Sequence, residues 1–449
     1  MTYYFNPEIE KMNRNELDAL IETRIKYTVK YAYDNSPFYH KWFKRNNISV
    51  SDIQTHDDLR ELPVISGKTM RDQQPPEKED FRFKCSPWED IYTIHETSGT
   101  SGRPKSFFLT WEDWQRYAEK YARSFTSQGF GAGDRIIVCA SYGMNVGANT
   151  MTLAAQKMGM TIIPEGKCSF PVRIIKDYQP TGIVASIFKL LRLARRMKVE
   201  GIDPQESSIK SLIAGGESFS QESRAYVEEV WGSDVFNTYG STEGTMCGEC
   251  TEKAGLHVPE DMVHLDVYDP NLKDFVDEGE CGRIVLTTLL PEGGKTGTLL
   301  LNYDTDDTTV VVSSKKCDCG RSHMRIMNPQ REAETFWVNG SPFNRVDIEA
   351  GVFQRENMDY LTGEYEAFIY GDEDQGEVTM RVSVECESKD GCNQEIIKEN
   401  FLKSFFQYKK GLNEAYVNGS FDILFNFTGP GDLEFYKIKG RPKRIVDRR

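Results

Sequence analysis

One short segment of this 449-residue chain is dense in groups that bind phosphate. From Glu96 to Lys105 it reads Glu-Thr-Ser-Gly-Thr-Ser-Gly-Arg-Pro-Lys. Glycine lets a backbone approach an anion closely, and successive backbone N–H groups can form a nest around phosphate oxygens. The Ser and Thr hydroxyls add neutral donors, and Lys105 adds positive charge. The candidate phosphate contacts are Thr97, Ser98, Gly99, Thr100, Ser101, Gly102 and Lys105.

A flexible Gly/Ser linker would have a similar composition, so the context of this segment matters. The segment ends in Pro-Lys and leads into an apolar, strand-like run from Phe107 to Leu109. A linker has no need of either feature. The order G-x-x-x-x-G-K-[ST] of a Walker-type loop is not present here. We therefore interpret the segment as a phosphate loop of a different kind.

A second group of side chains has the types and spacing of a metal site. Cys250 and His257 are followed, later in the chain, by Cys317-Asp-Cys319-Gly. Three thiolates and one imidazole are a standard closed ligand set for zinc. Cys247 competes with Cys250 for one place, and the spacing leaves that choice open. The alternative is a set of thiols without metal, but a Cys-x-Cys pair before glycine in a polar turn is not typical of core cysteines.

The other six cysteines carry no evident chemistry. We interpret them as core or surface residues, and Cys139, inside an apolar strand, as a small hydrophobic side chain. These six are Cys85, Cys139, Cys168, Cys281, Cys386 and Cys392.

Hydrophobic periodicity predicts the elements that must position these groups. Residues 6–39 have helical spacing, which ends at Asn35-Ser36-Pro37. Further on, short apolar runs alternate with helical patterns, which indicates β-α units around a largely parallel sheet. The predicted strands are 135–140, 161–164, 182–187, 211–214 and 235–239. The predicted helices between them are 147–158, 188–199 and 221–230.

Later strands follow one another without helices. Segments 282–290 and 308–314 predict a small antiparallel or barrel element. Beyond residue 330, strands at 365–370 and 377–385 and a helix at 394–406 predict a separate α+β domain. The expected fold class is α/β. A large N-terminal domain (1–330) has mostly parallel β-α layers plus a small β element, and a small mobile α+β domain (331–449) closes over it.

Composition excludes several classes of protein. Fifty-five basic and 69 acidic residues give a net charge of −14, which argues against general nucleic-acid binding. No apolar run is long enough to predict a membrane span. The first residues show no secretory signal pattern, and the cysteine pattern is not a disulfide framework, so we expect a cytosolic protein.

Several motifs, in their order along the chain, resemble those of adenylate-forming enzymes such as acyl-CoA synthetases. Ser98–Lys105 is similar to the signature loop of that superfamily, and Gly215-Gly216-Glu217 to its adenine-contacting segment. Tyr239-Gly240-Ser241-Thr242-Glu243 resembles its Tyr-Gly-x-Thr-Glu motif. Asp307 matches the ribose-binding aspartate, and Arg331 the arginine before the hinge. The segments 32–39, 62–64, 255–257 and 443–449 resemble the branch of phenylacetate–CoA ligases and coenzyme F-390 synthetases.

The resemblance implies a role for each of these positions. The phosphate loop would hold the β- and γ-phosphates of ATP, Thr242 would touch phosphate, and Glu243 would bind Mg²⁺. Tyr239 and Gly240 would lie at the adenine, with Asp307 on the ribose. Tyr142, Gly143 and Asn145 follow a strand end and match the region that lines the acyl or aryl pocket.

Three positions depart from the family pattern. Where the family has a catalytic lysine after a glycine, this chain has Arg441, with Lys439 nearby. Arginine keeps the charge without the compact ammonium geometry. The hinge aspartate is replaced by Ala333. The basic residues that this branch often carries around the ribose aspartate are replaced by Asn302, Asp304 and Asp306. These changes concern how the small domain rotates for the second, thioester-forming half-reaction, and they leave the ATP site itself largely intact.

The function these features predict is an ATP-dependent adenylating ligase that forms a substrate–AMP and pyrophosphate. The favoured substrate is an aromatic carboxylate that is then transferred to CoA. One alternative is transfer of AMP to the phenolic hydroxyl of the deazaflavin coenzyme F-420. Another is a degenerate nucleotide-binding regulatory protein. The expected partners are a small aromatic molecule, ATP, Mg²⁺ and Zn²⁺, with no nucleic acid or membrane, and a homodimer is left open.

Overall fold

The chain forms two compact units, which we describe separately. The computed structural model describes residues 3–99, 102–166, 171–372, 377–388, 390–438 and 441–449. Unit 1 comprises Met1–Ser186, Arg196–Gly216 and Ser233–Gln330. Unit 2 comprises Ile187–Arg195, Glu217–Gly232 and Arg331–Arg449. The division into functional domains 1–330 and 331–449 stays a prediction.

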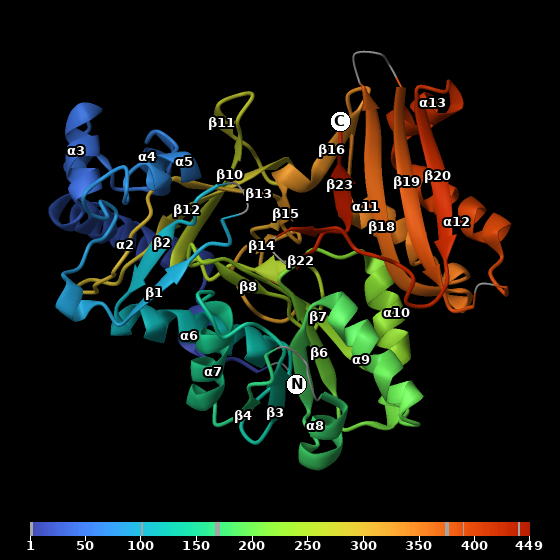
Figure 1. Ribbon diagram of the computed structural model, residues 1–449. Helices are drawn as coiled ribbons and strands as arrows, with labels where there is room; N and C mark the ends of the chain where they lie inside the picture. Colours follow the sequence, from blue (N-terminus) through green and yellow to red (C-terminus); the bar gives the residue numbers. More distant parts are fainter. Residues whose placement is uncertain (1–2, 100–101, 167–170, 373–376, 389, 439–440) are drawn as a thin grey trace. The chain divides into compact units, whose positions relative to one another are not determined.

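Five parallel strands form one end of the large sheet of unit 1, and Figure 1 labels four of them, β3, β4, β6 and β7. Its strands lie in the order β7-β6-β5-β3-β4, and each neighbouring pair is parallel. Ile136, Ile137 and Val138 of β3 are all buried, as expected for strands covered on both faces. The bounds are β3 (Arg135–Val138), β4 (Thr161–Ile163), β5 (Gly182–Ala185), β6 (Ser211–Gly215) and β7 (Asp234–Gly240). The predicted α/β class is confirmed.

Helices cover this sheet. α6 (Trp111–Ser127) and α7 (Gly147–Lys157) share an apolar cluster with β3, in which Phe125 and Met151 pack with Ile136. Thr110 caps α6 through a reciprocal pair of hydrogen bonds with Asp113, which fixes where the helix begins. α8 (Pro171–Tyr178) also belongs to unit 1, whereas α10 (Gln221–Trp231) and the first nine residues of α9 (Ile187–Val199) belong to unit 2.

Antiparallel strands continue the same sheet beyond β7, so they do not form a separate barrel. Along the described chain the order runs β11-β10-β12-β13-β14-β9-β8-β7, and β15 also pairs with β13. The bounds are β8 (Met246–Gly248), β9 (Leu256–His257), β10 (Val263–Asp269), β11 (Asp274–Phe275), β12 (Cys281–Thr288), β13 (Tyr303–Ser313), β14 (Arg325–Ile326) and β15 (Gln330–Arg331). One continuous sheet therefore links the predicted nucleotide motifs on β6, β7 and β13.

The N-terminal helix predicted over residues 6–39 is three helices instead. They are α1 (Pro7–Glu10), α2 (Arg14–Asn35) and α3 (Pro37–Arg45). The Asn13 side chain accepts a hydrogen bond from the backbone N–H of Glu16 and starts α2. Ser36 ends α2 and caps α3, so the Asn-Ser-Pro sequence separates two helices and does not open a loop.

Shorter elements connect these helices to the phosphate loop. They are α4 (His56–Arg60), α5 (Gly67–Arg71) and the antiparallel hairpin of β1 (Thr93–Glu96) and β2 (Ser106–Leu109). No helix in the described ranges combines the length and apolar character needed to cross a bilayer.

Unit 2 contains a four-stranded sheet in the order β20-β19-β18-β23. The strands are β18 (Leu361–Asp372), β19 (Glu377–Cys386), β20 (Phe421–Thr428) and β23 (Ile445–Asp447). Phe343, Phe401, Phe405 and Phe421 are fully buried between sheet and helices. The other elements are β16 (Thr335–Val338), β17 (Ser341–Asn344), α11 (Arg345–Val352), α12 (Gln394–Phe406), α13 (Lys410–Val417), β21 (Lys437–Ile438) and β22 (Arg441–Pro442).

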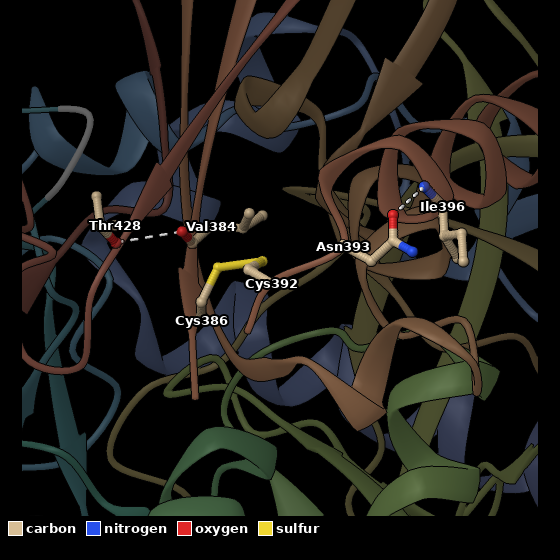
Figure 2. The surroundings of a disulfide bond; sticks show 6 residues. All are labelled: Val384, Cys386, Cys392, Asn393, Ile396 and Thr428. Carbon is tan, nitrogen blue, oxygen red and sulfur yellow. Dashed lines mark hydrogen bonds between the residues drawn. A yellow bond between two sulfur atoms is a disulfide. The ribbon is translucent and has the colours of Figure 1, made fainter. Parts of the chain in front are cut away.

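A disulfide joins the end of β19 to the start of α12 (Figure 2). Cys386 and Cys392 have Cα atoms 6.2 Å apart, and the Asn393 side chain next to them caps α12 by accepting from the N–H of Ile396. Our interpretation of these two cysteines as core or surface residues without evident chemistry did not anticipate this disulfide. Cys139 is also disulfide-bonded, which corrects its interpretation as a simple hydrophobic side chain. Cys168 lies outside the described residues.

Candidate active site

The phosphate loop connects the two strands of the β1–β2 hairpin. Its base is closed by two hydrogen bonds. The Thr97 N–H donates to the carbonyl of Lys105 (3.1 Å), and the Lys105 N–H donates to the Thr97 hydroxyl (3.0 Å). Gly99 has φ +63°, and a Cβ there would lie 2.9 Å from the carbonyl oxygen of Gly102. The loop therefore needs glycine at this position. Ser98 and Gly102 are exposed, and Thr100 and Ser101 lie outside the described residues.

Lys105 turns back from this loop into a buried contact with Glu243. Its Nζ lies 2.9 Å from Glu243 Oε1, and both side chains are less than one-tenth exposed. The same ammonium donates a hydrogen bond to the hydroxyl of Tyr303, at the start of β13. Two motifs that are far apart in the sequence thus meet through one charge pair.

The turn between β7 and β8 carries Thr242 and Glu243. The Ser241 N–H donates to the Thr245 carbonyl (3.0 Å), and the Gly244 N–H donates to the Ser241 carbonyl (3.2 Å). This short turn fixes the direction of the Glu243 side chain at the strand end.

Helix α6 also contacts this turn, through Lys120 and Tyr117. Lys120 donates to the Gly244 carbonyl at 2.6 Å, and burial lowers the pKa of Lys120 to about 8. Gly244 has φ +97°, and a Cβ there would lie 2.6 Å from the hydroxyl of Tyr117. Sequence reasoning missed Lys120 and Tyr117, because neither belongs to a motif and only the fold brings α6 to the turn.

The residues predicted for the nucleoside also come together. The Tyr239 hydroxyl donates to Asp307 Oδ2 at 2.7 Å, and burial raises the pKa of Tyr239 well above its ordinary value. Gly215 pairs with Thr238 across β6 and β7, and a Cβ on Gly215 would lie 2.8 Å from the Thr238 carbonyl oxygen. Gly216 follows with φ +82°, and Gly240 ends β7.

These contacts lie within unit 1 and form a chain of interactions that begins and ends at Lys105. Lys105 contacts Glu243, the β7 strand and turn join Glu243 to Tyr239, and Tyr239 contacts Asp307. Asp307 shares β13 with Tyr303, which contacts Lys105 again. The arrangement places the Glu243 carboxylate beside Lys105 of the phosphate loop and the Asp307 carboxylate beside the Tyr239 hydroxyl.

The predicted acyl-pocket residues lie between β3 and α7. The Tyr142 hydroxyl is 3.1 Å from Thr152 Oγ1, and Asn145 Oδ1 accepts from the N–H of Gly147 at 2.7 Å. The Glu96 N–H donates to the carbonyl of Met144 (3.1 Å), so the loop that contains Gly143 runs beside the start of the phosphate loop.

The remaining predicted residues belong to unit 2. Arg345 Nη1 donates to Glu217 Oε2 at 3.0 Å. Arg331 is exposed at the end of β15, and the backbone of Arg441 begins β22. Lys439 lies outside the described residues. The roles of these four residues stay predictions.

The metal-type cluster is assembled by β9 and two turns. The candidate ligand atoms of Cys250, His257, Cys317 and Cys319 all lie within 4.8 Å of one another. Cys250 Sγ and Cys317 Sγ are 3.8 Å apart, and Cys319 Sγ is 3.5 Å from His257 Nε2. Hydrogen bonding to Cys250 and to the imidazole lowers the pKa of the Cys319 thiol. This set agrees with the predicted Cys3His pattern.

The fold separates the two competing thiols. Cys247 packs into an apolar cluster with Leu256 and Val258, and burial raises its pKa to about 12. Cys250 follows β8 and faces the other ligands. Directly opposite His257 in the sheet is Gly248, so the cluster adjoins the strand that follows the Glu243 turn.

Comparison with known proteins identifies the family of this chain. A family model described as AMP-binding enzyme matches residues 22–288. A phenylacetate–coenzyme A ligase of Aromatoleum evansii is 31% identical over 448 residues, covering 98% of this chain and 96% of the relative. A phenylacetate–coenzyme A ligase of Thermus thermophilus is 30% identical and covers 72% of each chain.

Solved structures show the same fold. A 2-hydroxyisobutyryl-CoA ligase in the postadenylation state has a TM-score of 0.80 at 20% identity, covering 99% of this chain and 92% of that one. An anthranilate CoA ligase has a TM-score of 0.57 at 15% identity, covering 82% and 68%. The sequence matches carry the conclusion: the chain belongs to the AMP-binding enzyme family, in the phenylacetate–CoA ligase branch of the adenylate-forming superfamily, and is an ATP-dependent adenylating ligase.

Proposed function

We propose that this ligase activates an aromatic carboxylate such as phenylacetate and transfers the acyl group to CoA. The observation that carries the proposal is the match to a phenylacetate–coenzyme A ligase along almost the full length of both chains. The contacts of Lys105, Glu243, Tyr239 and Asp307 support it, because they gather the nucleotide motifs at one place.

The reaction would proceed in two balanced steps. A carboxylate oxygen attacks the α-phosphorus of ATP, the bond from that phosphorus to the bridging oxygen breaks, and pyrophosphate leaves. The CoA thiol then loses its proton and attacks the acyl carbon, and AMP leaves. Both steps bring anions together, so the site must supply positive charge and fixed donors.

The residues of this chain are suited to that demand. The phosphate loop and Lys105 would hold the β- and γ-phosphates, with Thr242 at the phosphate and Glu243 as an oxygen ligand for Mg²⁺. Mg²⁺, when bound, would neutralise charge on the triphosphate. Tyr239 and Asp307 would hold the nucleoside, and Arg441 would bring the cation that the family takes from lysine. Tyr142, Gly143 and Asn145 would contact the acid.

Product analysis tests this proposal. Enzyme, MgATP and a panel of aromatic acids, with and without CoA, are compared with enzyme, MgATP and coenzyme F-420 by mass spectrometry. We expect AMP and an aryl-acyl-CoA. An adenylylated deazaflavin would instead favour the F-390 alternative, and nucleotide binding without pyrophosphate release from any mixture would favour a regulatory protein.

We also propose that Cys250, His257, Cys317 and Cys319 hold a structural Zn²⁺. With Zn–S bonds of about 2.3 Å, two sulfurs of a tetrahedral site lie about 3.8 Å apart, and a sulfur and a nitrogen about 3.5 Å. The distances of 3.8 Å between Cys250 and Cys317 and 3.5 Å between Cys319 and His257 match both values. The metal would link His257 on β9 to the segments that carry Cys250, Cys317 and Cys319. The cytosolic location and the homodimer stay predictions.

A further inference from the structure

Arg71 lies beside the phosphate loop although it belongs to none of the motifs. It is the last residue of α5, and its side chain is half-buried. Its Nε is 3.7 Å from the position a Cβ would take on Gly102 of the loop. Its Nη1 is 3.7 Å from the position that a Cβ would take on Gly67. That Cβ position is 3.3 Å from Lys105 Nζ. The guanidinium therefore lies close to the loop at Gly102 and close to Gly67, the residue that adjoins the Lys105 ammonium.

The segment that carries Arg71 is held by contacts to the end of the phosphate loop and to strand β13. The Gln74 side chain donates to the carbonyl of Pro104 (2.7 Å) and accepts from the N–H of Ser106 (3.1 Å), at the end of the loop. On the other side, Ile65 pairs with Tyr303 of β13. These contacts fix the position of the Arg71 segment relative to the phosphate loop and to Tyr303, which contacts Lys105.

Charge pairing distinguishes Arg71 from its neighbours. Its guanidinium has no carboxylate or other hydrogen-bond partner in the described parts of the chain. One turn earlier in α5, the exposed Lys68 pairs with Asp72 at 2.6 Å. Lys105 is already engaged with Glu243 and Tyr303. Among the described residues, Arg71 is therefore a cation at the loop without a carboxylate partner.

We infer that Arg71 binds the terminal phosphates of the nucleotide and the pyrophosphate product. A guanidinium offers planar, paired donors that fit two phosphate oxygens, and a charge-assisted bond of this kind is stronger than a neutral one. The ligand class is the diphosphate end of a nucleoside triphosphate or inorganic pyrophosphate, not a nucleoside monophosphate. The inference rests on the proposed nucleotide site and adds a residue to it.

Calorimetry with ATP, pyrophosphate and AMP, each with Mg²⁺, tests this role. Arg71→Gln should weaken binding of ATP and pyrophosphate about 10- to 100-fold, the range expected for hydrogen bonds to a charged group, and leave AMP binding unchanged. Arg71→Lys should fall between wild type and Arg71→Gln. Lys68→Gln removes one charge from the same helix and is the matched control, expected to bind all three ligands like wild type. Thermal unfolding should be the same for all variants.

Two outcomes would overturn the inference. The first is that Arg71→Gln retains ATP and pyrophosphate affinity within threefold of wild type. The second is that it weakens AMP binding as much as ATP binding, which would indicate a general disturbance. Failure of the wild-type protein to bind either nucleotide is distinguishable from these. It would overturn the proposed nucleotide site itself, and the role of Arg71 with it.

Discussion

The buried pair of Lys105 and Glu243 predicts strong energetic coupling between the phosphate loop and the turn after β7. At 2.9 Å the attraction between two unit charges is about 6 kcal/mol for an effective dielectric constant of about 20. Loss of hydration opposes it. Removing one partner leaves the other charge buried, which costs about 3 kcal/mol. Lys105→Met or Glu243→Gln alone should therefore lower the local stability by about that amount.

The double variant separates the pair from its surroundings. With both charges gone, no unpaired ion remains, so the double change should cost at least about 2 kcal/mol less than the sum of the two single changes. Amide hydrogen exchange of residues 241–250, followed by mass spectrometry, measures the local opening free energy. Each single variant should exchange about 100-fold faster than wild type in that segment, whereas the double variant should be closer to wild type. Single effects that simply add would refute the charge coupling.

Three further predictions concern other parts of the molecule. Metal analysis should find one zinc per chain, which Cys319→Ser loses and Cys247→Ser keeps. A protein free of zinc would contradict the metal site. Tyr239→Phe removes one buried hydrogen bond to the predicted ribose-binding aspartate and should weaken ATP about threefold to tenfold in calorimetry, whereas unchanged affinity would remove Tyr239 from the site. Burial lowers the pKa of His264, but the Asp266 carboxylate 2.8 Å away outweighs burial, so the pKa is raised. This pair stabilises the fold below about pH 6.5 and loses that contribution as pH rises through the raised pKa, so the unfolding midpoint of His264→Gln should fall most at low pH. An equal loss at every pH would contradict it.

Some elements follow directly from local sequence. The helix predicted at 394–406 has those bounds in the structure, because its apolar spacing is regular and Asn393 caps it. The parallel strands were predicted because they are short apolar runs between helical patterns. The N-terminal helix was predicted too long. Periodicity continues through Met12 and Ser36, and only the capping side chains of Asn13 and Ser36 divide it.

The site is predictable only where its residues lie in motifs. Lys105, Glu243, Tyr239 and Asp307 could be named from the resemblance, but their contacts depend on a sheet that joins β7 to β13. Lys120 and Arg71 lie in ordinary helices, where a lysine or arginine usually faces solvent. The choice between Cys247 and Cys250 likewise depended on which thiol the fold turns toward the core.

The most direct test of the account is ATP–pyrophosphate exchange with Glu243→Ala. Adenylation is reversible, so the wild-type protein should incorporate labelled pyrophosphate into ATP only when an acceptable acid is present. Glu243→Ala removes the carboxylate that contacts Lys105 and would hold Mg²⁺, and it should abolish this exchange while the protein stays folded. Full exchange by Glu243→Ala, or no exchange by the wild-type protein with any acid or with the deazaflavin, would contradict the account.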